Sequence, residues 1–193
     1  MTRTFVALEM NNALQSHLAG IIRQVAQALP GIHWADASSI HLTLAFLGEL
    51  TDDQVTEAIE ATEMAAQQAQ PFSYCLSHLG TFGSPRYPRV VWMGIEEASG
   101  SLVAIHRILN KQLLKRGFEV ETRPFSPHLT LARLKSSLSS QDLQTLQSLL
   151  ADEPHRLAST ESYPVRYLDV MKSELQHTGA RYMCLQSCPI GKG

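Results

Sequence analysis

The tetrapeptide His-Leu-Thr-Leu occurs twice in the chain, at His41–Leu44 and at His128–Leu131. Side chains of an extended strand alternate between its two faces, so each copy directs His and Thr to one face and both Leu to the other. Given the leucine and threonine content of the chain, one such tetrapeptide after a histidine is expected by chance in roughly one sequence in a hundred. Two copies therefore indicate two related buried strands, each with a polar face available for chemistry.

The segments that surround the two tetrapeptides repeat in the same order. In both halves the histidine stands twelve positions after the end of a helical pattern, Leu29 to His41 and Arg116 to His128. Each half has the pattern strand, helix, strand, helix, strand, over residues 4–8, 14–29, 41–48, 51–69 and 72–79, and again over 90–95, 102–116, 128–133, 140–150 and 165–171. This predicts an α+β fold built by internal duplication.

We expect a single bilobal domain over residues 1–193, with repeat halves at about 1–82 and 88–188. A duplicated unit usually associates about a pseudo-twofold axis. The two lobes would then place antiparallel sheets along a central cleft, with the helices outside. Residues 80–88 form the segment richest in Gly and Pro and are predicted to be the loop between the halves. Residues 179–185 are predicted to add one more strand.

Composition limits the classes of protein that the chain can belong to. The chain has 193 residues, enough for an ample core without disulfide or metal support. Its 16 basic and 18 acidic residues argue against general electrostatic coating of nucleic acid, so a nucleic-acid substrate would be held locally, at an end. Three cysteines without zinc-type spacing fit a reduced compartment, and no apolar run reaches the length of a membrane span. We expect a soluble, cytoplasmic monomer without membrane contact.

The paired histidines and threonines suit acid-base displacement at phosphorus. Imidazole titrates near neutral pH, so one of His41 and His128 can act as a base while the other acts as an acid. The hydroxyls of Thr43 and Thr130 can donate hydrogen bonds to non-bridging phosphate oxygens. This arrangement requires no metal and no cofactor. The residues alone do not decide which histidine is the acid.

Two alternatives remain beside this interpretation. A zinc site is disfavoured because the two histidines lack a third ligand at a recognisable spacing. The site could also capture phosphate without turnover, as an RNA-end or nucleotide-binding module. The six remaining histidines are interpreted as structural or surface residues, namely His17, His33, His78, His106, His155 and His177.

Five residues after each histidine stand Phe46 and Arg133, which are equivalent in the duplication and are candidate substrate-binding residues. Phe46 could stack on a base or belong to the core, whereas Arg133 could pair with phosphate. Strict alternation would place this position on the face away from the histidine, so both roles require a β-bulge or a strand end. Trp34, Arg86, Tyr87 and Arg123 could line the mouth of the cleft, and Trp34 could equally be a core residue.

The residues around the two tetrapeptides resemble the RNA 2',3'-cyclic phosphodiesterases, also called 2'-5' RNA ligases, of the 2H phosphoesterase superfamily. The likeness spans nearly the whole chain, apart from the tail after Pro189. It is carried by Arg3–Leu8, by Trp34 seven residues before His41, by His41–Glu49, by Arg123–Arg133, and by Ser173–Leu175 and Gly179–Tyr182. No motif position departs from the family pattern.

The resemblance implies an enzyme that opens the terminal 2',3'-cyclic phosphate of RNA or of nucleotides to a 2'-phosphate, without a metal. His41 would be the proton donor to the leaving 3'-oxygen, and His128 the proton acceptor that activates water. The resemblance also implies a second outcome. If a 5'-hydroxyl end replaces water, the same site can join RNA halves through a 2'-5' linkage without ATP, and this ligation is the alternative main role.

Overall fold

The computed structural model describes residues 1–8, 10–152, 161–176 and 179–191. Its elements alternate between strands and helices in the duplicated order that the sequence predicts. They are β1 (Thr2–Leu8), α1 (Asn12–Ala28), the short 3₁₀ helix η1 (Ala37–Ser39), β2 (Leu42–Leu50), α2 (Asp52–Gln67), β3 (Phe72–Ser84), β4 (Tyr87–Glu96), α3 (Ser101–Lys115), β5 (His128–Arg133), α4 (Ser140–Asp152), β6 (Tyr163–Val165), β7 (Tyr167–Gln176) and β8 (Gly179–Pro189).

The described strands form two four-stranded antiparallel sheets, so the predicted α+β class is confirmed. One sheet has the order β2-β1-β7-β8 and the other the order β5-β4-β3-β6. The two orders correspond strand for strand when β1 is matched with β4 and β2 with β5. Each repeat contributes its third strand to the sheet of the other repeat, because β3 pairs with β4 and β7 pairs with β1.

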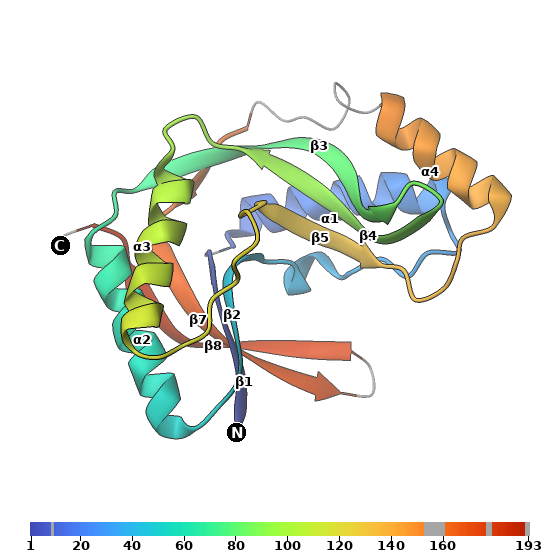
Figure 1. Ribbon diagram of the computed structural model, residues 1–193. Coiled ribbons are helices and arrows are strands. Elements are labelled where there is room, and N and C mark those ends of the chain that lie inside the picture. Colours follow the sequence, from blue (N-terminus) through green and yellow to red (C-terminus); the bar gives the residue numbers. More distant parts are fainter. Residues whose placement is uncertain (9, 153–160, 177–178, 192–193) are drawn as a thin grey trace.

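The helices are exchanged between the sheets in the same way. Helix α3 of the second repeat packs beside α2 and contacts β2 of the first sheet, and Figure 1 shows α2 and α3 side by side on its outer side. Helix α1 of the first repeat covers the second sheet instead. Leu29, which follows α1, packs in one apolar cluster with Val91 and Ala132 of that sheet. The exchange binds the two repeats into one interlocked structure.

Local sequence signals account for the helix boundaries. The predicted capping box at the start of α2 is present, because the backbone N–H of Gln54 donates to Thr51 Oγ1 at 3.3 Å and the Gln54 side chain accepts from the Thr51 N–H at 3.0 Å. Helix α1 is capped by Asn11, whose side chain accepts from the N–H of Leu14. Helix α4 begins at Ser140, as predicted.

Two predictions about the strands are wrong. Residues 80–88 are not a loop, because β3 and β4 continue through them as one long hairpin with its turn at Pro85-Arg86. Gly80 serves close packing there, since a Cβ at this position would overlap the indole ring of Trp92. The predicted strand 165–171 is divided at Arg166, where the chain leaves β6 in one sheet and enters β7 in the other.

Candidate active site

The two tetrapeptides occupy equivalent positions in the two sheets. Both leucines of each copy are buried, with exposed fractions between 0% and 4%, whereas Thr43 and Thr130 on the opposite face are only half-buried. This confirms the predicted division into an apolar face and a polar face. Strands β2 and β5 also contact each other directly, so the folded chain brings the two copies together.

Each histidine is fixed by its backbone in the same way. The Nδ1 atom of His41 lies 3.1 Å from the carbonyl oxygen of Ser39, and Nδ1 of His128 lies 2.8 Å from the carbonyl oxygen of Ser126. A carbonyl oxygen only accepts hydrogen bonds, so Nδ1 carries the proton and donates it in both rings. The other nitrogen, Nε2, is then the atom that can accept or release a proton in each ring.

A β-bulge interrupts each tetrapeptide at the same position. In the first sheet Thr43 is opposite Ala7 and Ala45 is opposite Val6, which leaves Leu44 without a partner in the register. In the second sheet Leu131 is left over in the same way, between Thr130 and Ala132. The extra residue shifts the alternation of the strand by one position. The residues that directly follow the bulge therefore change face, and in the first sheet a second register shift follows Phe46.

The bulges bring the residues five positions after the histidines onto the polar faces. Phe46 is opposite Phe5, which has the same orientation as Ala7, the partner of Thr43. Arg133 is opposite Val90, which has the same orientation as Trp92, the partner of Thr130. Both roles predicted for these residues require such a bulge, and the structure supplies one in each half.

Phe46 is not a core residue, because 54% of its surface is exposed. Its ring lies parallel to that of Phe5, with 6.0 Å between centroids, and the guanidinium carbon of Arg3 lies 5.3 Å from its centroid. Arg133 is also exposed at the end of β5. The ring of Phe46 and the guanidinium of Arg133 are thus both exposed on the polar faces. Their contacts with substrate stay predictions.

Two aromatic rings that are not among the residues predicted for the site enclose His41. The ring of Phe5 stacks on the imidazole with 4.5 Å between centroids, and the ring of Tyr182 meets it edge-on at 4.6 Å. Phe5 is completely buried. Alternation in the first strand predicts which face Phe5 lies on. Only the bulged register shows that this face also carries the histidine, so the sequence alone does not assign Phe5 to the site.

The surroundings of His41 disfavour its charged form. Burial lowers the pKa of His41 from 6.5 to about 4, although the hydrogen bond to Ser39 acts in the opposite direction. The positive charge of Arg133 makes a smaller contribution to the same lowering. Arg133 belongs to the second repeat, so a charge of one repeat acts on the histidine of the other.

His128 also lies among aromatic rings. The ring of Phe82 meets it edge-on at 4.8 Å, and the indole of Trp92 lies 6.3 Å away. Trp92 is half-buried on the polar face of β4, where it covers Gly80. Neither residue is predicted for the site from the sequence. Phe82 falls in the segment that is predicted to be a loop.

The remaining candidates lie in varied positions. Trp34 is half-buried, packs against the core and donates its Nε1–H to the carbonyl of Leu29 at 3.2 Å. Arg123 is exposed and paired with Glu121 at 2.5 Å.

Of the histidines interpreted as structural or surface residues, Nδ1 of His17 lies 2.5 Å from the Tyr163 hydroxyl, His33 is exposed, and the ring of His106 stacks on that of Phe125 with 3.9 Å between centroids. His78 is exposed with its ring edge-on to Trp92, while His155 and His177 lie outside the described residues.

Neither a metal cluster nor a membrane-spanning helix is found in the described part of the chain. No group of three or more His, Cys, Asp or Glu side chains there could hold a metal ion. None of the described helices is long and apolar enough to cross a bilayer.

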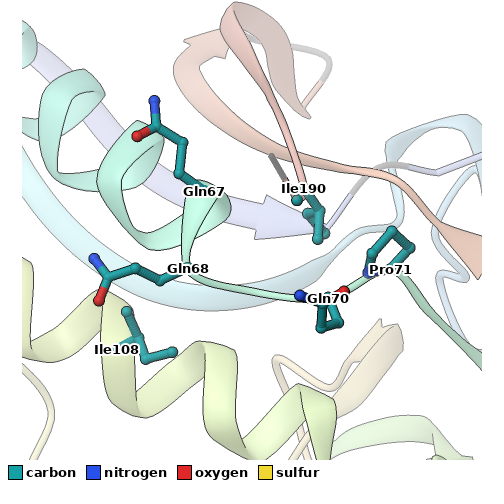
Figure 2. A pocket seen from close by; sticks show the side chains of 7 residues that line it. Gln67, Gln68, Gln70, Pro71, Ile108 and Ile190 are labelled. Atoms are coloured by element: carbon teal, nitrogen blue, oxygen red, sulfur yellow. The ribbon is translucent and has the colours of Figure 1, made fainter. Parts of the chain in front are cut away.

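A pocket of about 620 Å³ lies away from the histidines, between the end of α2, helix α3 and the end of β8 (Figure 2). It is lined by Gln67, Gln68, Gln70, Pro71, Ile108, Ile190 and Gly191. This lining contains no titratable or nucleophilic side chain, so the pocket offers no group for acid-base chemistry. The faces that carry His41 and His128 therefore remain the candidate active site.

Comparison with solved structures supports the fold. The crystal structure of TT0787 of Thermus thermophilus has a TM-score of 0.79 at 23% identity, and the match covers 99% of this chain and 100% of that chain. The crystal structure of Escherichia coli LigT complexed with 3'-AMP has a TM-score of 0.74 at 23% identity, and the match covers 99% of each chain.

Comparison with curated proteins identifies relatives named RNA 2',3'-cyclic phosphodiesterase. The protein from Thermotoga maritima is 27% identical over 99% of this chain and 97% of its own length. The protein from Aquifex aeolicus is 26% identical over 99% of this chain and 98% of its own length. A relative from Geobacillus stearothermophilus is 31% identical over 76% of this chain, but the match spans only 46% of that longer protein.

The family comparison covers most of the chain. Residues 14–174 match the family described as the 2'-5' RNA ligase superfamily, and this range includes both tetrapeptides, both bulges and all of β4. The match extends over more than half of the chain and agrees with the resemblance of the motifs and with the fold. The chain belongs to the 2'-5' RNA ligase superfamily.

Proposed function

We propose that this protein hydrolyses the terminal 2',3'-cyclic phosphate of RNA or of nucleotides to a 2'-phosphate. The observation that carries this proposal is the matched pair of histidines, each with Nδ1 bound to the carbonyl two residues earlier and with Nε2 left for proton transfer. The names of the curated relatives support the same reaction, since those from Thermotoga maritima and Aquifex aeolicus match over almost their full lengths.

In the proposed reaction His128 accepts a proton from water through Nε2, and the resulting hydroxide attacks the phosphorus. The bond between phosphorus and the 3'-oxygen breaks, and His41 donates the proton that the 3'-oxygen requires. The product carries a 2'-phosphate and a 3'-hydroxyl. Exchange with solvent then returns a proton to His41 and removes one from His128. The proposal requires no metal and no cofactor.

The hydroxyls of Thr43 and Thr130 are proposed to bind the non-bridging oxygens. They lie on the same faces as the histidines, two positions later in each strand, and so approach the phosphate from both repeats. Hydrogen bonds from neutral donors to these oxygens stabilise the negative charge that is redistributed in the transition state. Arg133 is proposed to bind the phosphate group and Phe46 to stack on the base.

The lowered pKa of His41 has to be reconciled with its role as proton donor. Without substrate, burial and Arg133 hold His41 in its neutral form at pH 7. A bound cyclic phosphate brings a negative charge, which opposes the effect of Arg133 and favours the protonated ring. In this proposal the ring of His41 becomes protonated when the substrate binds. In the empty site the ring stays neutral, which avoids the free-energy cost of a buried positive charge.

Ligation of RNA halves through a 2'-5' linkage is the second candidate, and the description of the matched family favours it. It uses the same groups, with a 5'-hydroxyl in place of water.

We also propose that the chain forms one bilobal domain, is a monomer and acts in the cytoplasm.

The test is incubation of the protein with 2',3'-cyclic AMP in the presence of a chelator, with separation of 2'-AMP and 3'-AMP. We expect 2'-AMP, and we expect His41→Ala and His128→Ala to lose nearly all turnover, because general acid-base groups contribute about 10² to 10⁴-fold each. The exposed His33 provides the control variant, His33→Ala. Loss of activity with the metal would contradict the metal-free mechanism.

Two further results separate the alternatives. If a 5'-hydroxyl oligonucleotide diverts the product of a cyclic-phosphate RNA to a 2'-5' linkage at the expense of hydrolysis, ligation is the main role. If wild type binds the nucleotide without hydrolysis and the histidine variants bind it equally well, the protein is a non-catalytic binding module.

A further inference from the structure

Tyr87 is an exposed aromatic residue on the polar face of the second sheet. Of its surface, 61% is exposed, and it pairs with Ser84 at the tip of the β3–β4 hairpin. A register shift follows Phe82 and leaves Arg89 without a partner on β3. Because of this shift Tyr87 has the orientation of Val90 and Trp92, and not the orientation of the helix-covered Val91.

Two hydrogen bonds hold the hairpin tip in place. The backbone N–H of Tyr87 donates to the Ser84 hydroxyl at 3.1 Å. The side chain of Gln147 in α4 donates to the carbonyl of Pro85 at 3.3 Å, and Figure 1 shows the tip of the hairpin beside α4. A ring on a fixed support loses less conformational freedom when it contacts a ligand. Tyr87 is therefore a preorganised surface.

The hairpin tip lies in line with the polar residues of β5, beyond Arg133. Along β5 the polar face presents His128, then Thr130, then Arg133, and Arg133 is opposite Val90. Tyr87 lies three residues beyond Val90 along β4, about 10 Å at 3.3 Å per residue. A strand of RNA that ends at His128 and Thr130 would reach Tyr87 if it extended past Arg133.

Charge favours this direction over the opposite one. Arg86 and Arg89 flank Tyr87 and are exposed, and Lys135 is exposed just after β5. At the other end of β4 stand Glu96 and Glu97. A polyanion is attracted to the basic end and repelled from the acidic end.

We propose that the hairpin tip is a subsite for the nucleotides that precede the cyclic phosphate, with Tyr87 as a stacking surface for a base and Arg86 as a partner for phosphate. This inference rests on the proposed function and extends it to the substrate class. The preferred substrate is the end of an RNA strand, and a mononucleotide such as 2',3'-cyclic AMP leaves the subsite empty. Base stacking on an aromatic side chain tolerates any sequence.

The test compares a trinucleotide that ends in a 2',3'-cyclic phosphate with 2',3'-cyclic AMP. We expect the ratio of their kcat/KM values to fall roughly tenfold in Tyr87→Ala, within the range that removal of one stacking ring causes. Tyr87→Trp should preserve the ratio, because it keeps a stacking surface. Val103→Ala is the control, since Val103 in α3 is also 61% exposed and lies outside the proposed subsite.

A binding measurement keeps this subsite separate from the proposed reaction. Fluorescence anisotropy gives the Kd of a dye-labelled trinucleotide with a 3'-phosphate, whether or not the protein hydrolyses anything. Tyr87→Ala should weaken this binding roughly tenfold, and Arg86→Gln should weaken it and make it less dependent on salt. Absence of hydrolysis by wild type would overturn only the proposed function. An unchanged ratio together with an unchanged Kd in Tyr87→Ala would overturn the subsite.

Discussion

The imidazole of His41 stacks on the ring of Phe5, with 4.5 Å between centroids and 30° between planes. Phe5 is completely buried, so the contact places one side of the imidazole against the core. Because Nδ1 is bound to Ser39, the ring keeps a fixed orientation and changes its charge only at Nε2. We therefore expect the protonation of His41 to depend on what occupies the site beside it.

Binding of an anion should raise the pKa of His41. In the free protein burial and Arg133 hold the pKa of His41 at about 4, and a phosphate ion near Arg133 would offset its charge. An NMR titration of the His41 ring, with and without inorganic phosphate, measures this directly. Arg133→Gln should also raise the pKa in the free protein. Titration of His41 near 6.5 without phosphate would contradict the assigned environment.

The same burial should make the protein sensitive to acid. The pKa of His41 is lower in the folded state, about 4, than in the unfolded state, 6.5. As the pH falls below 6.5, His41 becomes protonated in the unfolded chain but stays neutral in the folded chain. The free energy of unfolding therefore decreases between pH 6.5 and pH 4. The full loss from this group is about 3 kcal/mol. Urea denaturation at pH 7 and at pH 4.5 measures most of this loss.

The variant His41→Gln should lose less stability across this range than wild type, because glutamine does not titrate. His33→Gln is the matched control, since His33 is exposed, and it should retain the acid sensitivity of wild type. Equal losses in wild type and His41→Gln would mean that other groups determine the acid response.

The sequence predicts which faces carry the chemistry, but not which strands are neighbours. The alternation in His41–Leu44 is sufficient to divide buried leucines from the polar face, and the structure confirms it. The exchange of β3 and β7 between the sheets has no local signal, because the hydrophobic pattern of a strand gives its faces and not its partners. The sequence therefore predicts the duplication, but not the exchange of strands between the two sheets.

Register and long-range packing determine the features of the site that the sequence does not predict. The need for a bulge before Phe46 and Arg133 follows from strict alternation, but its position at Leu44 and Leu131 depends on strand pairing. The sequence predicts a loop for the segment that contains Gly80, because Gly and Pro usually interrupt strands. In the structure the missing side chain of Gly80 makes room for the ring of Trp92.

Removal of either threonine hydroxyl should slow the chemical step without unfolding the protein. Thr43→Val and Thr130→Val keep the shape of half-buried side chains and remove one donor each. Loss of one such donor typically lowers kcat by about 10²-fold or more, because the interaction is strongest in the transition state. Thr→Ser at the same positions should restore most of the rate. A change confined to KM would indicate ground-state binding only.

Substitution of Gly80 by alanine should disturb the surroundings of His128 from a distance. The added Cβ would overlap the indole of Trp92, which must move, and Trp92 lies 6.3 Å from His128. Overpacking of this kind costs about 1 to 3 kcal/mol of stability. We expect Gly80→Ala to lower both the free energy of unfolding in urea and the kcat for 2',3'-cyclic AMP.

Gly31→Ala is the matched control, because no atom lies within 4 Å of a Cβ built there. It should change neither quantity appreciably. The variant Gly80→Ala, Trp92→Phe has a smaller ring facing the new methyl group, so it should regain stability relative to Gly80→Ala alone. If Gly80→Ala were as stable and as active as wild type, Trp92 would not be held by this contact, and the ordering of His128 would depend on Phe82 and Ser126 instead.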